Sequence, residues 1–398
     1  MIKNQHIVCI SNTSWYGPFT KSTVQLMSRL ATDNKLLFVE YPYTIKDVLF
    51  ALLKKGKAPI LRILGINKRI SEIKTEQGSV IYQLVVPPVF PCDFIKNEAL
   101  FSFVFSINTR IYLRCLSKAL KQLKMNDVIS TSAYNPYYGL ALKGKLNEKL
   151  NLYYSYDGPN IRRHGKRVLK IDAGYSIVAD AVITTSDFLA LDKKKYNARC
   201  FVVKNGVDFE SFRKHSNSED FSKEKIIIGY IGSMDFRFDI EMVEDAVKAI
   251  PEYTFHFVGS IRNEAIKSRL EKYANVQFFA PVKPENVPAL LSRYNAGIIP
   301  YLQNDINRNI YPLKINEYLA VGVPVIMSRF AILPEFEGMT DTVTNSADFI
   351  RSIKKQVEED NTLKRRIRSE FASKNSWDNR AEEFSDIIEE LLNNPKTQ

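Results

Sequence analysis

The 398-residue chain has few of the residues that build metal centres or covalent cross-links. Its four histidines are scattered, and so are its four cysteines, which include no C-x-x-C pair: Cys9, Cys92, Cys115 and Cys200. Zinc sites and disulfide frameworks need Cys and His residues in characteristic spacings, so we expect neither. Widely spaced thiols are also in keeping with a reducing compartment, and we therefore expect a cytoplasmic protein.

The sequence also lacks long apolar segments. Its longest apolar stretch, Ala99 to Ile107, is interrupted by serine and is much shorter than the roughly 20 residues that a bilayer-spanning helix needs. The chain opens into a predicted strand, His6 to Ile10, rather than into a basic segment followed by an apolar one. We therefore expect neither a signal peptide nor a transmembrane helix.

The overall composition is that of an ordinary globular protein, but the charged residues are unevenly distributed along the chain. The length suffices for two or three domains with large cores. Residues 1–213 hold 32 Lys and Arg against 16 Asp and Glu, whereas the remaining residues hold 24 against 28, which together give the net charge of +12. A half with this surplus of positive charge predicts a polyanionic partner, either nucleic acid or an anionic membrane.

Short apolar runs alternate with helical patterns along most of the chain. Strands rich in Val and Ile and separated by helices indicate parallel sheets that are buried on both faces. A polar, charged passage at 213–225 divides the predicted strands into two series. The first series is Ile7–Ile10, Leu36–Glu40, Val80–Val86, Asp127–Thr131, Leu152–Tyr156, Ala181–Thr185 and Phe201–Lys204, and the second is Ile226–Ile231, Thr254–Val258, Val276–Phe279, Gly297–Pro300 and Val323–Met327. We therefore predict an α/β protein with two doubly wound domains.

The segment from Arg308 to Ser328 concentrates charge around a predicted helix start. Pro312 suits the first helical position, because it lacks an N–H group that the helix would leave unpaired there. The pattern predicts a short helix over Leu313 to Val321, and Gly322 is expected to end it.

Within this segment, Lys314 and Glu317 lie three residues apart and so share a helix face. Arg308 lies in the loop that precedes them. A carboxylate and two cations at a loop–helix junction suit a nucleotide sugar, because the carboxylate accepts hydrogen bonds from ribose hydroxyls and the cations donate to phosphates. The alternative is a surface Glu–Lys pair with a nearby solvated Arg.

Residues 312–325, P-L-K-x-x-E-Y-L-A-x-G-x-P-V, resemble the donor-site motif of GT-B glycosyltransferases related to glycosyltransferase family 4. The most similar branch makes bacterial surface polysaccharides of the teichuronic-acid and capsule type. The resemblance implies that Glu317 holds the ribose hydroxyls and that nearby basic residues hold the diphosphate. Asn309 stands where many family members carry a second Glu, and the branch with R-x3-P-L-K also lacks that Glu. This departure from the family pattern concerns only the contact with the sugar, and the expected ribose contact of Glu317 is unaffected.

A second motif, I-G-x-x-x-x-R-x-D, ends the first predicted strand of the second series. Small residues at Gly232 and Ser233 let backbone N–H groups approach a phosphate. The resemblance makes Arg237 a phosphate ligand and places Gly259, at the end of the next strand, in the same cleft. A tight turn without a ligand is the alternative.

Candidate acceptor residues follow two strands of the first series. Asp157 ends a predicted strand, and His164 lies in a basic run at 162–167. Either residue can be a general base or can hold the acceptor hydroxyl, whereas the alternative has Asp157 capping a turn and His164 solvated. Trp15, Tyr16 and Gly17 follow the first strand, where Trp15 is expected either to stack on a sugar or to pack in the core.

The stretch from Thr44 to Arg69 mixes large apolar residues with Lys and Arg. At a membrane interface it would press apolar side chains into lipid while its cations meet anionic head groups. The apolar side chains are those of Val48, Leu49, Phe50, Leu52 and Leu53. An ordinary surface helix is the alternative.

Together, these observations and the resemblance predict a GT-B glycosyltransferase with two Rossmann-like domains facing a central cleft. Residues 1–213 are expected to form the acceptor-side domain and residues 214–376 the donor domain, with 377–398 crossing back to the first as the last helix does in GT-B transferases. The donor-site residues are then Gly232, Ser233, Arg237, Gly259, Arg308, Asn309, Pro312, Leu313, Lys314 and Glu317. The catalytic candidates are Asp157, His164, Arg237, Arg308 and Lys314.

The expected reaction moves a hexose, with retention, from a UDP- or GDP-linked donor to a growing, lipid-linked surface glycan of the capsule or lipopolysaccharide type. No D-x-D motif occurs, so Arg237, Arg308, Lys314 and backbone N–H groups rather than a metal are expected to meet the charge on the leaving diphosphate. No cofactor is expected. The enzyme would lie in the cytoplasm at the inner face of the cell membrane, without a nucleic-acid partner.

Two other functions stay open at this stage. A nucleotide-sugar 2-epimerase on the same fold needs acid–base carboxylates and a His around the sugar, and the donor domain offers only His256, inside a predicted strand. A non-catalytic basic protein that binds membrane or nucleic acid accounts for the basic half, but it leaves the cluster from Arg308 to Glu317 unexplained.

Overall fold

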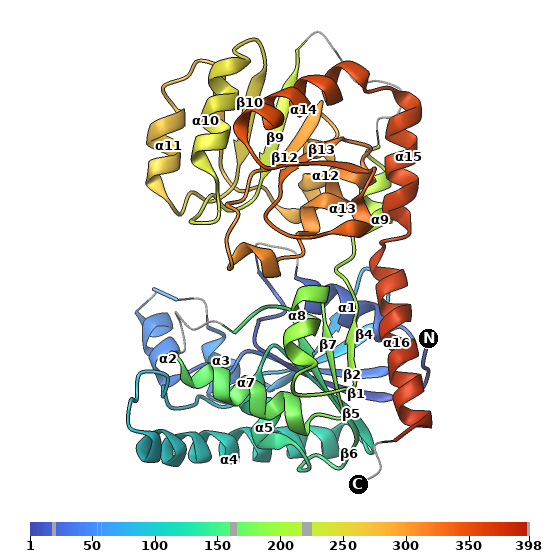
Figure 1. The fold of residues 1–398 in the computed structure, drawn as a ribbon. Coiled ribbons are helices and arrows are strands. Elements are labelled where there is room, and N and C mark those ends of the chain that lie inside the picture. The colour runs from blue at the N-terminus through green and yellow to red at the C-terminus, as the bar shows by residue number, and fades with distance from the viewer. Residues whose placement is uncertain (18–20, 54, 57, 160–164, 217–224, 396–398) are drawn as a thin grey trace. The chain divides into compact units, whose positions relative to one another are not determined.

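The computed structural model describes residues 1–17, 21–53, 55–56, 58–159, 165–216 and 225–395. The chain divides into two compact units (Figure 1). Unit 1 consists of Met1–Lys204 together with Ala381–Gln398, and unit 2 consists of Asn205–Arg380. The last helix, α16 (Trp377–Asn393), therefore begins in unit 2 and ends in unit 1.

Unit 1 is built on one sheet, which has eight strands among the described residues. The strand order is β3-β4-β2-β1-β5-β6-β7-β8, and every neighbouring pair is parallel except β3 and β4. The strands are β1 (His6–Ser11), β2 (Lys35–Val39), β3 (Ile70–Lys74), β4 (Val80–Leu84), β5 (Val128–Ala133), β6 (Glu148–Ser155), β7 (Ala181–Thr184) and β8 (Cys200–Val202). Strand β3, at the edge, is the one that the sequence did not predict.

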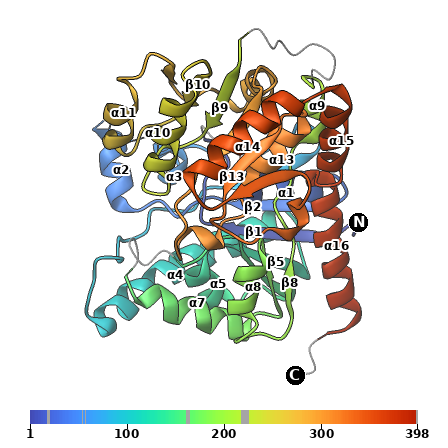
Figure 2. The same cartoon turned by 45° about the horizontal axis from the view of Figure 1, so that its top comes forward.

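The helices of unit 1 pack on this sheet through apolar faces. They are α1 (Ser22–Leu30), α2 (Ile45–Leu52), α3 (Ile60–Ile63), α4 (Glu98–Gln122), α5 (Pro136–Leu142), α7 (Arg167–Val178) and α8 (Asp187–Lys193). Figures 1 and 2 show α4, α5 and α7 side by side. The long helix α4 starts where the Asn97 side chain accepts a hydrogen bond from the Leu100 N–H, and it buries Tyr112 and Leu116 against the sheet.

The C-terminal part of α16 belongs to the core of unit 1. The Phe384 ring meets the Tyr154 ring edge-on, with the ring centres 5.7 Å apart. The Ser385 hydroxyl accepts a hydrogen bond from the N–H of Ile2. These contacts confirm the prediction that the final helix crosses back to the first sheet.

Unit 2 contains a fully parallel sheet of six strands within its described residues, in the order β11-β10-β9-β12-β13-β14. The strands are β9 (Ile227–Ile231), β10 (Thr254–Val258), β11 (Val276–Phe279), β12 (Ala296–Ile299), β13 (Val325–Ser328) and β14 (Thr340–Val343). The sequence predicted all of them except β14, which lies at the edge of the sheet and is polar. The parallel sheets of the two units confirm the predicted fold class.

The helices of unit 2 form two groups on its sheet. Helix α10 contacts α11 and α14, and α13 contacts α9 and α15, which Figure 2 also shows. The helices are α9 (Phe209–Arg213), α10 (Ile240–Ala249), α11 (Glu264–Leu270), α12 (Val287–Leu291), α13 (Leu313–Ala320), α14 (Ser346–Glu359) and α15 (Thr362–Ser373), with 3-10 turns η1 (Pro284–Asn286), η2 (Asn307–Asn309) and η3 (Pro334–Phe336). This two-sided cover is the arrangement of a doubly wound fold.

Candidate functional site

The strand order of unit 2 defines where a ligand is expected to bind. From β9 the chain runs outward through β10 and β11, then returns to the other side of β9 as β12 and continues through β13 and β14. Open α/β sheets bind ligands at the carboxyl ends of the strands where the order reverses, which here is between β9 and β12. The loops that follow β9, β10 and β12 therefore surround the candidate site.

Two glycines line these strand ends. Gly232 and Gly259 have φ angles of +144° and +145°, which L side chains rarely adopt. A Cβ at Gly259 would lie 1.9 Å from the carbonyl oxygen of Gly232, and a Cβ at Gly232 would lie 2.7 Å from Nζ of Lys314. Only glycine fits at either position, because the backbone of one loop and the Lys314 side chain occupy that space. Ser233, next to Gly232, is partly exposed.

Lys314 and Arg237 meet over one tyrosine. Nζ of Lys314 donates a hydrogen bond to Oη of Tyr301 at 2.9 Å, and it lies 5.6 Å from the ring centres of both Tyr230 and Tyr301. The guanidinium of Arg237 also lies 5.6 Å from the Tyr301 ring centre and pairs with Asp235 at 2.7 Å. Two cations that are 77 positions apart in the sequence thus share one end of the sheet.

The two cations influence the ionisation of their neighbours. Burial would raise the pKa of the Tyr301 hydroxyl, but the charges of Lys314 and Arg237 and the hydrogen bond from Lys314 outweigh burial and lower it. The hydrogen bonds between Arg237 and Asp235 raise the pKa of the guanidinium and, against the effect of burial, lower that of the carboxyl. Positive charges that lower the pKa of a hydroxyl also attract other anions, including a diphosphate.

Helix α13 carries the predicted motif. It begins at Leu313, so Pro312 is the N-cap, with extended backbone at φ −78° and ψ 123°, and the prediction that it occupies the first helical position was one residue wrong. The helix ends at Ala320 with Val321 as its C-cap, and Gly322 follows with a φ of +82°. The Gly322 N–H bonds to the Leu319 carbonyl, and the next N–H bonds to the Tyr318 carbonyl. This Schellman arrangement is the glycine stop that the sequence predicted.

Glu317 lies one turn along α13 from Lys314 and is partly exposed. Among the residues that the structure describes, none forms a hydrogen bond or an ion pair with its carboxylate. Loss of solvent raises the pKa of Glu317, and the charge of Lys314 opposes that shift. A carboxylate without an internal donor has its oxygens available for the hydroxyls of a ligand.

Arg308 and Asn309 lie in the 3-10 turn η2 before α13. Arg308 is exposed and pairs with Asp305, with Nη2 2.8 Å from Oδ1. The Asn309 side-chain amide donates to the Asp305 carbonyl at 3.3 Å. Their neighbour Asn307 is buried and donates to the Leu302 carbonyl at 2.8 Å, so the turn is anchored next to the end of β12. A contact of Arg308 with phosphate stays a prediction.

The acceptor candidates lie in unit 1, where the strand order reverses between β1 and β5. Trp15 packs its ring edge-on against Phe38, with ring centres 5.0 Å apart, and its backbone N–H donates to Oε1 of the buried Glu40 at 2.8 Å. Tyr16 is 65% exposed. A Cβ at Gly17 would lie 2.8 Å from Nζ of Lys21, whose ammonium group donates to backbone carbonyls of this loop.

Asp157 lies two residues beyond β6, at the same edge of the sheet. It is exposed, and its Oδ1 accepts a hydrogen bond from the Gly158 N–H at 2.8 Å. This local bond is the turn cap that we considered as the alternative to an acceptor contact. His164, the other candidate base, lies outside the described residues.

Sequence reasoning missed three members of the donor cluster, Tyr230, Asp235 and Tyr301. One signal was available: Tyr301 directly follows a predicted strand, where side chains reach the carboxyl edge of the sheet. In the described part of the chain, no three His, Cys, Asp or Glu residues are arranged to hold a metal ion. Nor is any helix there long and apolar enough to span a membrane.

A family of known proteins matches part of the second unit. Residues 225–359 match the family model described as "Glycosyl transferases group 1". A curated relative, the putative teichuronic acid biosynthesis glycosyltransferase TuaH of Bacillus subtilis, is 33% identical over 158 residues. That alignment spans 37% of this chain and 40% of the relative, so it relates part of each protein.

Solved structures resemble the whole chain. Sucrose-phosphate synthase from Thermosynechococcus elongatus gives a TM-score of 0.70 at 15% identity, over 98% of this chain and 100% of that one. Anabaena HepE in complex with UDP and glucose gives 0.63 at 10% identity, over 96% and 99%. The catalytic domain of Arabidopsis thaliana starch synthase IV, bound to ADP and acarbose, gives 0.65 at 10% identity, over 98% and 100%. The chain therefore has the GT-B fold, and residues 225–359 within its second unit resemble the group 1 glycosyltransferases.

Proposed function

We propose that this protein transfers a sugar, with retention, from a nucleotide-diphosphate donor to a growing, lipid-linked bacterial surface glycan. The observation that carries this proposal is the joint position of Lys314 and Arg237 at Tyr301, beside a glycine-lined strand end. A diphosphate needs close approach to backbone and concentrated positive charge, and this site supplies both.

In the proposed donor complex, the diphosphate lies against Gly232 and Ser233 and within reach of Lys314 and Arg237. Helix α13 contributes its first backbone N–H groups, which have no acceptor inside the helix. Glu317 then accepts hydrogen bonds from the ribose hydroxyls. Because negative charge grows on the departing diphosphate, fixed cations here stabilise the transition state more than the bound donor.

The nucleotide is proposed to be UDP, with GDP as the next candidate. Anabaena HepE, which shares the fold, is described with UDP and glucose, although starch synthase IV is described with ADP. The sugar is proposed to be a hexose, and retention follows from the kinship with family 4, with the departing phosphate as the base. No specific observation favours the 2-epimerase, since His256 lies inside β10, with its ring against Phe279 and Tyr294.

The acceptor assignment rests on the relative and on the basic unit. TuaH is a putative teichuronic acid biosynthesis glycosyltransferase, which supports a surface polysaccharide of the capsule or cell-wall type.

Of the apolar side chains proposed to enter lipid, Val48 is buried against Ile63 and Val85, so that part of the prediction was wrong. The others on α2 and just after it remain exposed, at 56% for Leu49, 43% for Phe50, 59% for Leu52 and 67% for Leu53.

These exposed apolar residues and the positive charge of unit 1 support the proposal that the protein works in the cytoplasm, at the inner face of the cell membrane. Unit 1 would hold the glycan acceptor and unit 2 the donor. Acidic lipid, rather than nucleic acid, is the proposed polyanionic partner, because exposed leucines favour a bilayer and have no role in binding nucleic-acid phosphates.

A thermal-stability screen against UDP, GDP, dTDP, CDP and ADP sugars tests the proposal. A ligand at 100 times its dissociation constant adds about 2.7 kcal/mol to the free energy of unfolding. We expect one nucleotide class to raise the melting temperature of the wild type, and to raise that of a Lys314→Met variant clearly less. Stabilisation by none of the five, or equal stabilisation of the variant, would contradict the donor site.

A further inference from the structure

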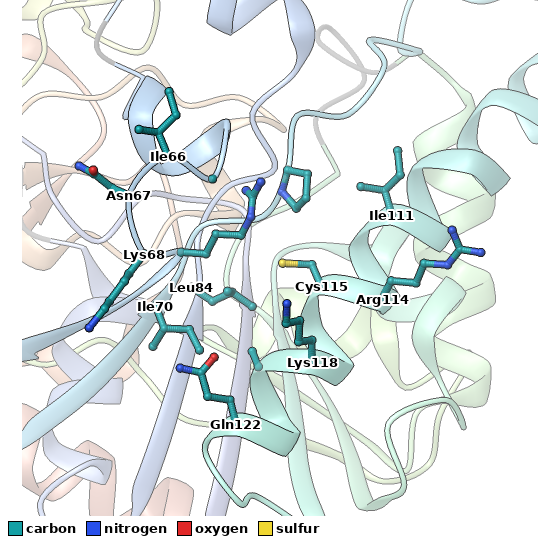
Figure 3. A pocket seen from close by; sticks show the side chains of 14 residues that line it. Ile66, Asn67, Lys68, Ile70, Leu84, Ile111, Arg114, Cys115, Lys118 and Gln122 are labelled. Atoms are coloured by element: carbon teal, nitrogen blue, oxygen red, sulfur yellow. The ribbon is translucent and has the colours of Figure 1, made fainter.

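A cavity of about 700 Å³ opens in unit 1 at the side of the sheet formed by β3 and β4 (Figure 3). The loop after α3 forms one wall, the C-terminal half of α4 forms the other, and the end of β4 forms the base. The lining residues are Gly65 to Ile70, Leu84, Pro87, Ile111, Arg114, Cys115, Lys118, Ala119 and Gln122. None of them belongs to the proposed transferase site.

The charges of this pocket are all positive. Four lining residues are cations, Lys68, Arg69, Arg114 and Lys118, and none of the described lining residues is Asp or Glu. The guanidinium of Arg69 is fixed by hydrogen bonds to the carbonyl oxygens of Arg62 at 3.1 Å and Ile63 at 2.7 Å. The other three cations are exposed and have no acidic partner among the described residues.

The cations surround the opening from both walls. In Figure 3, Lys118 and Cys115 project from α4 toward the loop, while Lys68 and Arg114 extend outward at the rim. Like charges that line one cavity repel one another, and an anion placed between them relieves that repulsion. The arrangement therefore suits a negatively charged ligand.

The rest of the lining is apolar and contains no aromatic ring. The apolar side chains of the lining include those of Ile70, Leu84, Pro87 and Ile111, and the only uncharged polar side chains besides Cys115 are two amides. A sugar needs many paired hydrogen-bond groups, and a nucleobase gains from an aromatic face, so neither is favoured here. An anion attached to an apolar chain matches both kinds of lining.

The apolar surface also continues out of the pocket. Ile66, at its rim, is 69% exposed, and the preceding residues Leu61 and Leu64 are 52% and 49% exposed. Exposed apolar side chains of this size beside cations are typical of surfaces that rest on lipid. The opening thus lies where an acyl chain can leave it along an apolar path.

We propose that this pocket binds the phosphate head group of a membrane lipid, with Arg69 and Lys118 at the phosphate and Ile66 against the chain. The site rests on the proposed function, since it gives the acidic lipid proposed there a defined binding place, but its occupancy requires neither a sugar donor nor transfer. It would hold unit 1 on the bilayer at a defined position, whereas a diffuse basic surface would only attract it.

Calorimetric titration of the full chain with dihexanoyl phosphatidic acid below its micellar concentration tests the chemistry. We expect one bound lipid per chain, and binding of inorganic phosphate and of zwitterionic dihexanoyl phosphatidylcholine that is at least about tenfold weaker, since each lacks the chain or the net charge. Equal binding of inorganic phosphate would refute the lipid assignment. Absence of binding by both anions would refute the anion site itself.

Matched variants distinguish the pocket from the general charge of the unit. Lys68→Gln with Lys118→Gln removes two lining cations, and Arg110→Gln with Lys121→Gln removes two exposed cations of α4 that do not line the pocket. We expect the first pair to weaken binding of phosphatidic acid about tenfold or more and the second to change it less than about threefold. Equal losses would show that the attraction is diffuse.

Cys115 reports occupancy directly, because it lines the pocket and is half-buried. Bound lipid should slow its alkylation by iodoacetamide, mapped by peptide mass spectrometry, while the half-buried Cys92, outside the pocket, keeps its rate. Unchanged alkylation of Cys115 at saturating lipid would place the ligand elsewhere. Lys314→Met should leave this protection intact, which separates failure of the lipid site from failure of the donor site.

Discussion

Replacing Lys314 with methionine removes the ammonium group from the donor cluster and keeps most of the side-chain volume. Lys314 is the residue that connects the elements of the site: its Nζ donates to Tyr301 at 2.9 Å, and it packs against Gly232. If the ammonium also meets the diphosphate, the variant loses a hydrogen bond between charged groups, which contributes about 1.5–3 kcal/mol. That is a loss in nucleotide affinity of about 10- to 150-fold.

Turnover should fall further than affinity, because charge on the leaving diphosphate is larger in the transition state than in the bound donor. Calorimetry with UDP, or with whichever nucleotide stabilises the wild type, measures the first loss, and initial rates at saturating donor measure the second. The variant also leaves the Tyr301 hydroxyl without its donor, so we expect the free energy of unfolding to fall by about 1–3 kcal/mol. Binding is therefore compared well below the melting temperature.

Two further measurements test the reasoning. Lys267→Met is the control, because Lys267 lies on α11 and makes only a long 4.0 Å pair with Glu271, so donor binding should not change. Loss of Lys314 should also raise the pKa of Tyr301, whose present lowering depends on that charge, and the tyrosinate absorbance should then appear at higher pH. Nucleotide binding by Lys314→Met within twofold of the wild type would refute the proposed role.

Three other changes test separate parts of the site. Glu317→Ala should weaken nucleotide binding by roughly 2–4 kcal/mol. It should have little effect on folding, since no described residue donates a hydrogen bond to the carboxylate. Calorimetry that shows binding within twofold of the wild type would reject the ribose contact. Arg237→Ala should reduce kcat more than it raises KM, and an unchanged kcat would mean uniform binding only. Gly259→Ala should lower the free energy of unfolding, measured in urea, by more than about 1 kcal/mol beyond the loss in the control Gly78→Ala. Both glycines have positive φ, but of the two only Gly259 would bring a Cβ against backbone atoms. Equal losses in the two variants would show that this close approach costs nothing.

Sequence alone determined the architecture where the signal is local. Strands buried on both faces, such as β1 and β9, appear as unbroken apolar runs, and the end of helix α13 is marked by Gly322. Lys314 and Glu317 could be paired from their spacing alone, because the helical repeat fixes which residues share a face. Each of these features is specified by residues that are close together in the sequence.

Tertiary structure decided what depends on distant partners. Strands β3 and β14 were missed because edge strands are only half covered and show no continuous apolar run; their pairing with β4 and β13 makes them strands. Val48 is buried because it packs against Ile63 of α3 and against Val85, which directly follows β4.

The donor cluster shows the same division. Tyr230, Tyr301 and Lys314 come from the ends of two strands and from one helix, and parallel pairing of β9 with β12 places those ends at one edge of the sheet. Local sequence cannot specify such a meeting, because the positions of the strands relative to one another are set by burial of the whole sheet rather than by the residues next to each functional group.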